Sequence, residues 1–175
     1  LIELSELAKQ QPVTENSELA LDWFNGRRTP NVDPSLTAAI VNLDLGSSPV
    51  NIFQALVEAT CFGSRAIVEH VEQQGVPIKG VIGIGGIAKK SDYVMQTLAD
   101  VLQRPIKVHK SEETCALGAC MLAATAAGLY PTLSDAMKGM GSGFEKEYFP
   151  NPEMKNLYDK RYMKYNTLGS AINKL

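Results

Sequence analysis

A short apolar run that ends in glycines constrains this chain more than any other stretch. Residues 80–84, Gly-Val-Ile-Gly-Ile, show no alternation of polar and apolar side chains, which favours a strand buried on both faces in the centre of a parallel sheet. Gly85 and Gly86 follow, and Ser91 stands where it can cap the next helix. Glycines between a strand and a helix let a ligand approach the backbone, and a helix N-terminus favours a phosphate group. The stretch therefore predicts a nucleotide site.

The segments on either side of this run alternate between strand and helix. Apolar periodicity predicts strands over residues 19–24, 38–45, 80–84 and 106–108, and helices over residues 1–9, 48–74, 91–102, 114–127, 133–140 and 152–175. The long second helix has Ser48 and Pro49 at its start and Gly75 just past its end, which are favoured capping residues. The helix over residues 114–127 is apolar on almost every side, which predicts that it is buried. The alternation indicates an α/β fold, with a mixed sheet whose parallel core is flanked by helices.

Composition excludes several classes of protein. The 175 residues suffice for one domain with a core, and the net charge of −2 argues against a nucleic-acid partner. No apolar run approaches the roughly 18 residues that a membrane span needs, so no membrane partner is expected. Cys61, Cys115 and Cys120 follow no metal-ligand spacing and suit a reducing, cytoplasmic compartment. The first residue is Leu, so we expect the chain to be a piece of a longer protein.

The glycine run is open to other interpretations. Residues 83–88, Gly-Ile-Gly-Gly-Ile-Ala, match the dinucleotide fingerprint, but the next strand ends in Val108-His109-Lys110 without the carboxylate that would hold a ribose. An NAD(P)-binding domain therefore stays as an alternative, as does a tight turn without a ligand. A P-loop is excluded, because no Gly-Lys-Ser/Thr follows the glycines.

Three segments together resemble the FGGY family of carbohydrate kinases. Residues 22–34, Asp-Trp-Phe-Asn-Gly-Arg-Arg-Thr-Pro-Asn-Val-Asp-Pro, resemble the family's Gly-x-Arg-x-Pro…Asp-Pro segment. Residues 84–86 with residues 95–102 resemble its adenosine segment, and Leu-Gly-Ala-Cys at 117–120 resembles its next helix. Order and spacing agree over almost the whole chain. Within the family, residues 23–30 and 144–152 are most similar to the ribulokinase branch.

The resemblance implies an actin-like, hexokinase-like (ribonuclease H-like) ATPase fold of two domains. Residues 1–175 would be the C-terminal nucleotide-binding domain, ending in a helix over 150–175. The implied activity is transfer of the γ-phosphate of ATP to a sugar, L-ribulose to L-ribulose 5-phosphate in arabinose catabolism. Mg²⁺ would be bound mainly by the phosphates and the other domain. A xylulokinase or another FGGY sugar kinase is one alternative, and a non-catalytic actin-like or chaperone-like nucleotide-binding module is another.

The resemblance also assigns the nucleotide contacts. The family's adenosine-contacting glycine pair corresponds to Gly85 and Gly86, with Gly86 at the contacting position. The residue that opens the next helix, often Asn in the family, corresponds to Lys90 or Ser91, and this departure leaves its side-chain contact open. The family's catalytic aspartate precedes the segment present here. No catalytic residue is therefore assigned, and the isolated chain is expected to bind nucleotide weakly and not to phosphorylate sugar.

Three further expectations concern exposed groups. Arg27 and Arg28 either clamp phosphate or sugar across a cleft or pair with nearby acids. Lys89 and Lys90 either approach the nucleotide phosphates or are solvated. The sheet would lack its earlier strands, and an uncovered edge strand invites pairing, so a homodimer is expected.

Overall fold

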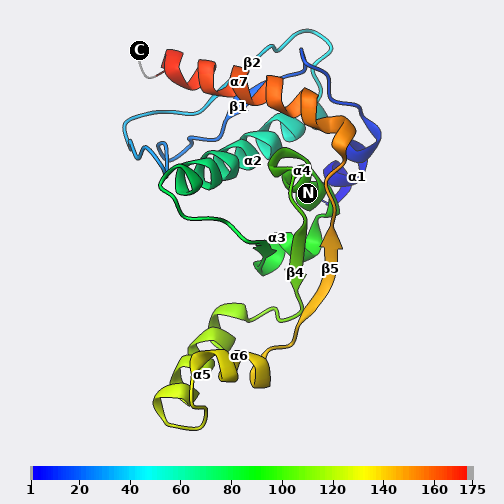
Figure 1. The fold of residues 1–175 in the computed structure, drawn as a ribbon. Coiled ribbons are helices and arrows are strands. Elements are labelled where there is room, and N and C mark those ends of the chain that lie inside the picture. The colour runs from blue at the N-terminus through cyan, green and yellow to red at the C-terminus, as the bar shows by residue number, and fades with distance from the viewer. Residues whose placement is uncertain (1, 173–175) are drawn as a thin grey trace.

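The computed structural model describes residues 2–172 and divides into a helical body, a small sheet and a projecting arm (Figure 1). Its elements, in chain order, are α1 (Ile2–Gln10), β1 (Leu19–Leu21), β2 (Ala39–Val41), α2 (Pro49–Gln73), β3 (Val81–Gly83), α3 (Gly85–Lys90), α4 (Asp92–Leu102), β4 (Ile106–His109), α5 (Thr114–Ala126), α6 (Leu133–Met140), β5 (Phe144–Tyr148), the 3₁₀ turn η1 (Pro152–Met154) and α7 (Lys155–Ile172). The predicted α/β class with a mixed sheet is confirmed. The last helix begins later than predicted, and residues 173–175 of that prediction lie outside the described residues.

The strands form two separate sheets. β1 and β2 pair antiparallel, with Leu19 opposite Val41. The other sheet has the order β3-β4-β5, in which β3 and β4 are parallel and β5 runs antiparallel to β4. Within the described residues β3 is thus an edge strand, and Ile82 is 55% exposed. The prediction of a central strand buried on both faces is wrong here, because an apolar run specifies burial but not which strands stand beside it.

β5 was not predicted from the sequence. Its residues are Phe-Glu-Lys-Glu-Tyr, and four of the five are exposed. Charged side chains are common on edge strands, where they discourage pairing with other chains. The only buried member is Tyr148, which packs in the small core beneath β4 with Met95 and Ile106. A strand with one anchoring side chain leaves little periodic signal in the sequence.

Helix α2 is the spine of the body, and its predicted ends are confirmed. The Ser48 hydroxyl accepts a hydrogen bond from Asn51 N at 3.3 Å, and Asn51 Oδ1 accepts one from Ser48 N at 3.0 Å. This reciprocal capping box satisfies backbone N–H groups that the first turn leaves free. Gly75 has φ +82°, the left-handed conformation that ends many helices. The core lies where α2 meets β1, α4 and α7, around the fully buried Phe62.

A buried ion pair joins α2 to α7. Glu58 and Arg161 are 0% and 1% exposed, and Arg161 Nε donates to Glu58 Oε2 at 2.9 Å. The same guanidinium donates to the carbonyl oxygens of Thr14 and Glu18, which fixes the loop that leads into β1. Burial raises the pKa of Glu58 to about 7, although Arg161 opposes the rise. Glu58 Oε1 has no hydrogen-bond partner among the described residues.

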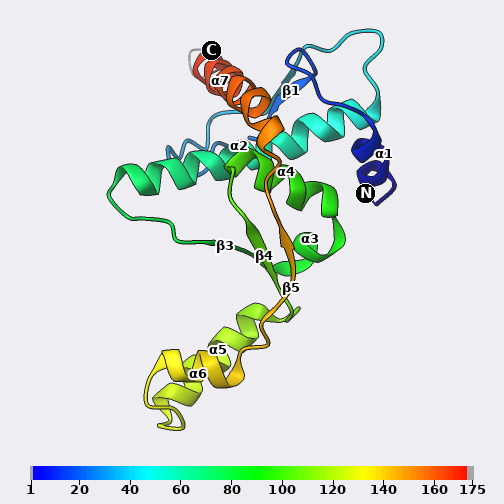
Figure 2. The same ribbon diagram turned by 45° about the vertical axis from the view of Figure 1, so that its right-hand side comes forward.

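The arm consists of α5 and α6, which project away from the body in both views (Figure 2). Of the residues in α5 only Met121 is buried, and Leu122 is 59% exposed. The prediction that α5 is buried is therefore wrong for this chain. A helix that is apolar on every side needs neighbours on every side, and the described residues supply mainly α6.

Candidate functional site

The glycine loop, residues 83–86, connects β3 to the short helix α3. Three of its four residues are glycines, and their surroundings differ. A side chain at Gly83 would bring its Cβ within 2.7 Å of Met95 Cε and 3.3 Å of Ala88 Cβ, so the Met95 side chain would have to shift. Gly85 has φ +81°, a backbone conformation that residues other than glycine adopt only with strain.

Gly86 has neither reason to be glycine. A Cβ built on Gly86 meets nothing within 4 Å, and its φ lies outside the left-handed region. Its neighbours Ile84 and Ile87 are 52% and 62% exposed, so the open backbone lies in an apolar surface. Glycine inside a helix costs up to about 1 kcal/mol relative to alanine. The packing thus does not require glycine at Gly86, as it does not at Gly80 or Gly118, and it leaves the Gly86 backbone open to a ligand.

The other two predicted contact residues lie differently. Ser91 is 5% exposed, its hydroxyl lies 3.1 Å from the hydroxyl of Ser5 on α1, and it accepts a bond from Val94 N at 3.3 Å. Its predicted role as the cap of the next helix is confirmed, with α4 as that helix. Lys90 is exposed at the end of α3. The structure thus places Gly85, Gly86 and Lys90 along α3 and holds the Ser91 side chain between α1 and α4, and the nucleotide contacts of all four stay predictions.

Lys89 is not the solvated side chain that the sequence favoured. Its ammonium donates to the carbonyl oxygen of Lys110 and lies 3.4 Å from the Glu145 carboxylate. It therefore ties α3 to the end of β4 and to the start of β5. This arrangement holds α3, and with it the glycine loop, against the sheet.

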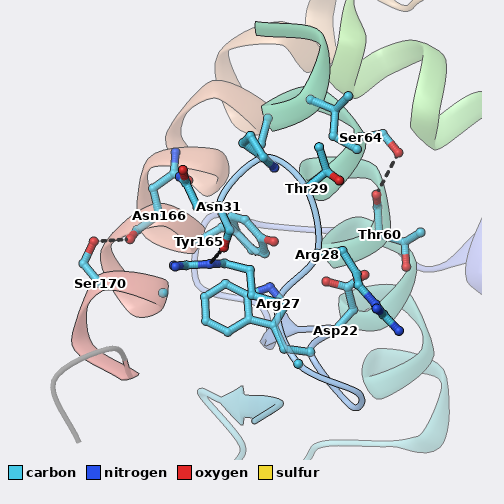
Figure 3. A pocket seen from close by; sticks show the side chains of 17 residues that line it. Asp22, Arg27, Arg28, Thr29, Asn31, Thr60, Ser64, Tyr165, Asn166 and Ser170 are labelled. Atoms are coloured by element: carbon cyan, nitrogen blue, oxygen red, sulfur yellow. Dashed lines mark hydrogen bonds between the residues drawn. The ribbon is translucent and has the colours of Figure 1, made fainter. Parts of the chain in front are cut away.

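Arg27 and Arg28 lie at a different place, which we name the arginine pocket (Figure 3). It is a cavity of about 350 Å³ between the loop over residues 26–31, α2 and α7, and no residue of the glycine loop lines it. Arg27 crosses its centre, with its guanidinium 5.3 Å from the ring of Trp23 and its Nε bonded to Asn31 O at 2.5 Å. Arg28 points to the side where Asp22 lies.

Neither arginine lies within ion-pair distance of a described acid, although the pKa of Asp33 is lowered by the hydrogen bonds from Ser35 and, to a smaller extent, by the charge of Arg27. Burial raises the pKa of Asp22.

The surrounding motif has a structural role as well. Gly26 has φ +74°, and a Cβ there would lie 2.5 Å from Pro34 Cα, while Arg27 and Asp33 exchange two backbone hydrogen bonds of 2.9 and 3.0 Å. The Gly-x-Arg-x-Pro…Asp-Pro pattern thus closes a tight loop.

Sequence reasoning missed an inward-facing polar stripe on α4. Tyr93, Thr97 and Asp100 are 9%, 3% and 7% exposed, although the apolar periodicity of this helix pointed to other positions. Their spacing of four and then three residues places them on one face of the helix. That spacing is visible in the sequence, but polar groups at such positions are more often solvated than buried.

Comparison with known proteins identifies the family. A model of the C-terminal domain of the FGGY family of carbohydrate kinases matches residues 2–127. The chain belongs to this family. The predicted resemblance is confirmed.

Curated relatives support the same assignment. Ribulokinases from Vibrio parahaemolyticus and Bacillus licheniformis are 46% and 40% identical to this chain over 98% of its length. The ribulokinase of Halalkalibacterium halodurans is 41% identical over 94% of the chain. The chain spans only about a third of these relatives, 30%, 32% and 30% of their lengths.

Solved structures confirm the fold class. The xylulose kinase of Rhodospirillum rubrum superposes with a TM-score of 0.85 over 98% of this chain and 34% of its own, at 23% identity. The Plasmodium falciparum glycerol kinase, solved with ADP, gives a TM-score of 0.75 at 22% identity over 98% of this chain and 33% of its own. The fold is the actin-like fold of FGGY sugar kinases. Among residues 2–172, no helix is both long and apolar enough to cross a membrane.

Proposed function

We propose that this chain is the ATP-binding C-terminal domain of a sugar kinase that phosphorylates L-ribulose to L-ribulose 5-phosphate. The sugar is supported by the identity of up to 46% to proteins named ribulokinase. The nucleotide is supported by one observation above all, the open backbone at Gly86. Xylulose is the runner-up substrate, since a neighbouring structure carries the name xylulose kinase, but that likeness supports only the fold.

The adenosine of ATP would lie over Gly86, with its base against the exposed side chains of Ile84 and Ile87. Gly85 would set the direction of the loop, and Lys90 would reach the nucleotide through its exposed side chain. Ser91 would act by positioning α4, because its hydroxyl is already hydrogen-bonded. Lys89 would keep the loop in place through Lys110 and Glu145.

The chemistry would be shared with the rest of a longer protein. Phosphoryl transfer depends mainly on positioning and on stabilising charge, to which Mg²⁺ contributes when it is bound with ATP. Within residues 2–172 no group of three or more His, Cys, Asp and Glu side chains is arranged for a metal ion. The phosphates and the other domain would therefore hold Mg²⁺, and the catalytic aspartate would lie in that domain. This chain would hold the adenosine end and help to exclude water.

Location and assembly are proposed on narrower grounds. The three free thiols Cys61, Cys115 and Cys120 support a reducing, cytoplasmic location. The unpaired edge of β3 supports a homodimer formed by strand pairing. Light scattering that finds only monomer at high concentration would rule the dimer out.

Calorimetric titration of this chain with ATP, ADP, AMP and NAD tests the nucleotide site. We expect adenine nucleotides to bind and Gly86→Val to weaken them at least tenfold, because the valine methyls would occupy the space of the adenosine. The matched control is Gly80→Val, a second glycine with no neighbour within 4 Å and no left-handed φ. Preferential binding of NAD, or equal binding by the two variants, would contradict the site.

The sugar is tested on the longer protein, with Mg-ATP and either L-ribulose or D-xylulose. We expect the higher kcat/KM with L-ribulose. A preference for D-xylulose would transfer the assignment to the alternative substrate and leave the nucleotide site untouched.

A further inference from the structure

A second cavity lies between α1, α4 and β5, away from both the glycine loop and the arginine pocket. Its volume is about 650 Å³, and none of the residues 83–91 lines it. The end of α1 and the loop over residues 11–13 form one wall, and the residues around Tyr148 and Asn151 form another. The floor is the polar stripe of α4, together with Gln54 from α2.

Asp100 is the decisive group in this floor. Its Oδ1 accepts hydrogen bonds from Asn151 N at 2.7 Å and from Gln96 Nε2 at 2.9 Å. Among the described residues, its Oδ2 accepts none, and no lysine or arginine forms an ion pair with it. A carboxylate that is 7% exposed and lacks a cation is costly, since burial penalises an uncompensated charge.

The two glutamines beside Asp100 have only acceptors left, whereas the Tyr93 hydroxyl, also in the floor, has no hydrogen-bond partner among the described residues and can donate or accept. Gln54 Nε2 donates to Ala8 O and Gln11 O, at 3.1 and 2.8 Å. Gln96 Nε2 donates to Asp100 Oδ1 and to Phe149 O, the latter at 2.8 Å. Each amide has two hydrogens, so both are used in each glutamine and only the carbonyl oxygens remain. A ligand that reaches the Asp100 carboxylate and these carbonyl oxygens must therefore bring donors to them.

The cations at the rim are already paired. Lys9 lies 2.6 Å from Glu6, and Lys146 lies 2.5 Å from Asp92. Glu147, also on the rim, forms no ion pair with a described residue. The charge left uncompensated around the cavity is therefore negative, from Asp100 inside and Glu147 at the edge.

We propose that this cavity binds a small organic molecule through a primary ammonium group. An ammonium carries three donors and no acceptor, which matches the free oxygen of Asp100 and the glutamine carbonyl oxygens, and its charge compensates Asp100. The ammonium donates to Asp100 Oδ2 and to the Thr97 hydroxyl, whose side chain lines the same cavity. The carbon part of the ligand rests on Tyr158 and Met154, which line the same cavity. The site is independent of the sugar kinase reaction.

Titration of the ¹⁵N-labelled chain with n-butylamine, followed by NMR, tests this site. The backbone signals of Thr97, Asp100 and Asn151 are expected to shift saturably. n-Butanol, which has the same carbon chain and no charge, is the matched ligand and should leave them in place. Sodium chloride at equal ionic strength controls for screening.

Asp100→Asn is the discriminating variant. The asparagine Oδ1 still accepts from Asn151 N and Gln96 Nε2, but an NH₂ group, which donates and carries no charge, replaces the free Oδ2. We therefore expect n-butylamine to bind at least about tenfold more weakly. Asp135→Asn, on α6, is the control and should bind as the unchanged chain does. If Asp100→Asn loses its dispersed spectrum, Thr97→Val takes its place and should weaken binding by a smaller factor. Binding of n-butanol as strong as that of n-butylamine, unchanged binding by these variants, or no saturable shift would each overturn the proposal.

Discussion

Helices α2 and α5 are both rich in apolar residues, yet one is the centre of the body and the other projects from it. α2 concentrates its apolar side chains on one face and packs against β1, α4, α1 and α7. α5 spreads them around its whole circumference and packs mainly against α6. Residues 54–62 of α2 find their burying neighbours within residues 2–172, whereas Met121 is the one residue of α5 that the described residues bury. Apolar content by itself therefore does not decide whether a helix lies in the core or in an exposed arm.

The largest expected effect comes from shortening one apolar side chain to alanine in each of the two regions. Phe62→Ala should lower the free energy of unfolding by about 3–5 kcal/mol, because Phe62 is fully buried and contacts the rings of Tyr158, Tyr162 and Tyr165. Leu122→Ala, in the arm, removes a side chain that is 59% exposed. It should change the free energy of unfolding by less than about 0.5 kcal/mol. Urea unfolding followed by circular dichroism measures both. A comparable loss from the two variants would mean that α5 is part of the core.

An intermediate effect depends on pH and belongs to the body alone. The pKa of Glu58 is raised from 4.5 to about 7, so the native state holds the Glu58 proton more tightly than the unfolded chain does. The resulting stabilisation is complete below about pH 4.5 and is lost as the pH rises through about 7. The unfolding midpoint in urea should therefore fall over this interval, and Glu58→Gln should flatten the fall. An equal slope in the variant would assign the pH dependence to other groups.

The smallest effect compares the caps of two helices. Ser48→Ala removes the cap of α2 and should cost the whole body about 1 kcal/mol. Thr132 caps α6 in the same way, through Asp135 N at 3.2 Å, but Thr132→Ala should speed amide hydrogen exchange only in the arm. Exchange measured by NMR distinguishes a local from a global change. Faster exchange in α2 on Thr132→Ala would show that body and arm unfold together.

Much of the body was predictable because its signals are local. The Ser48 cap, the terminal Gly75 and the Ser91 cap each act within a few residues, and all were visible in the sequence. The family was also predictable, since its motifs depend on residue identity and order. The Gly86 position, whose nucleotide contact stays a prediction, came from those motifs and not from periodicity.

The remaining features depended on what lies across the fold. The sequence alone determined where most helices begin and end and which family the chain belongs to. Only the tertiary structure decided that β3 is an edge strand, that α5 is exposed, that Arg27 stacks on Trp23 away from the glycine loop, and that Asp100 faces inward. The physical reason is that periodicity states which side chains favour burial, whereas burial itself requires a second surface, and that surface comes from residues distant in the chain or is absent from it.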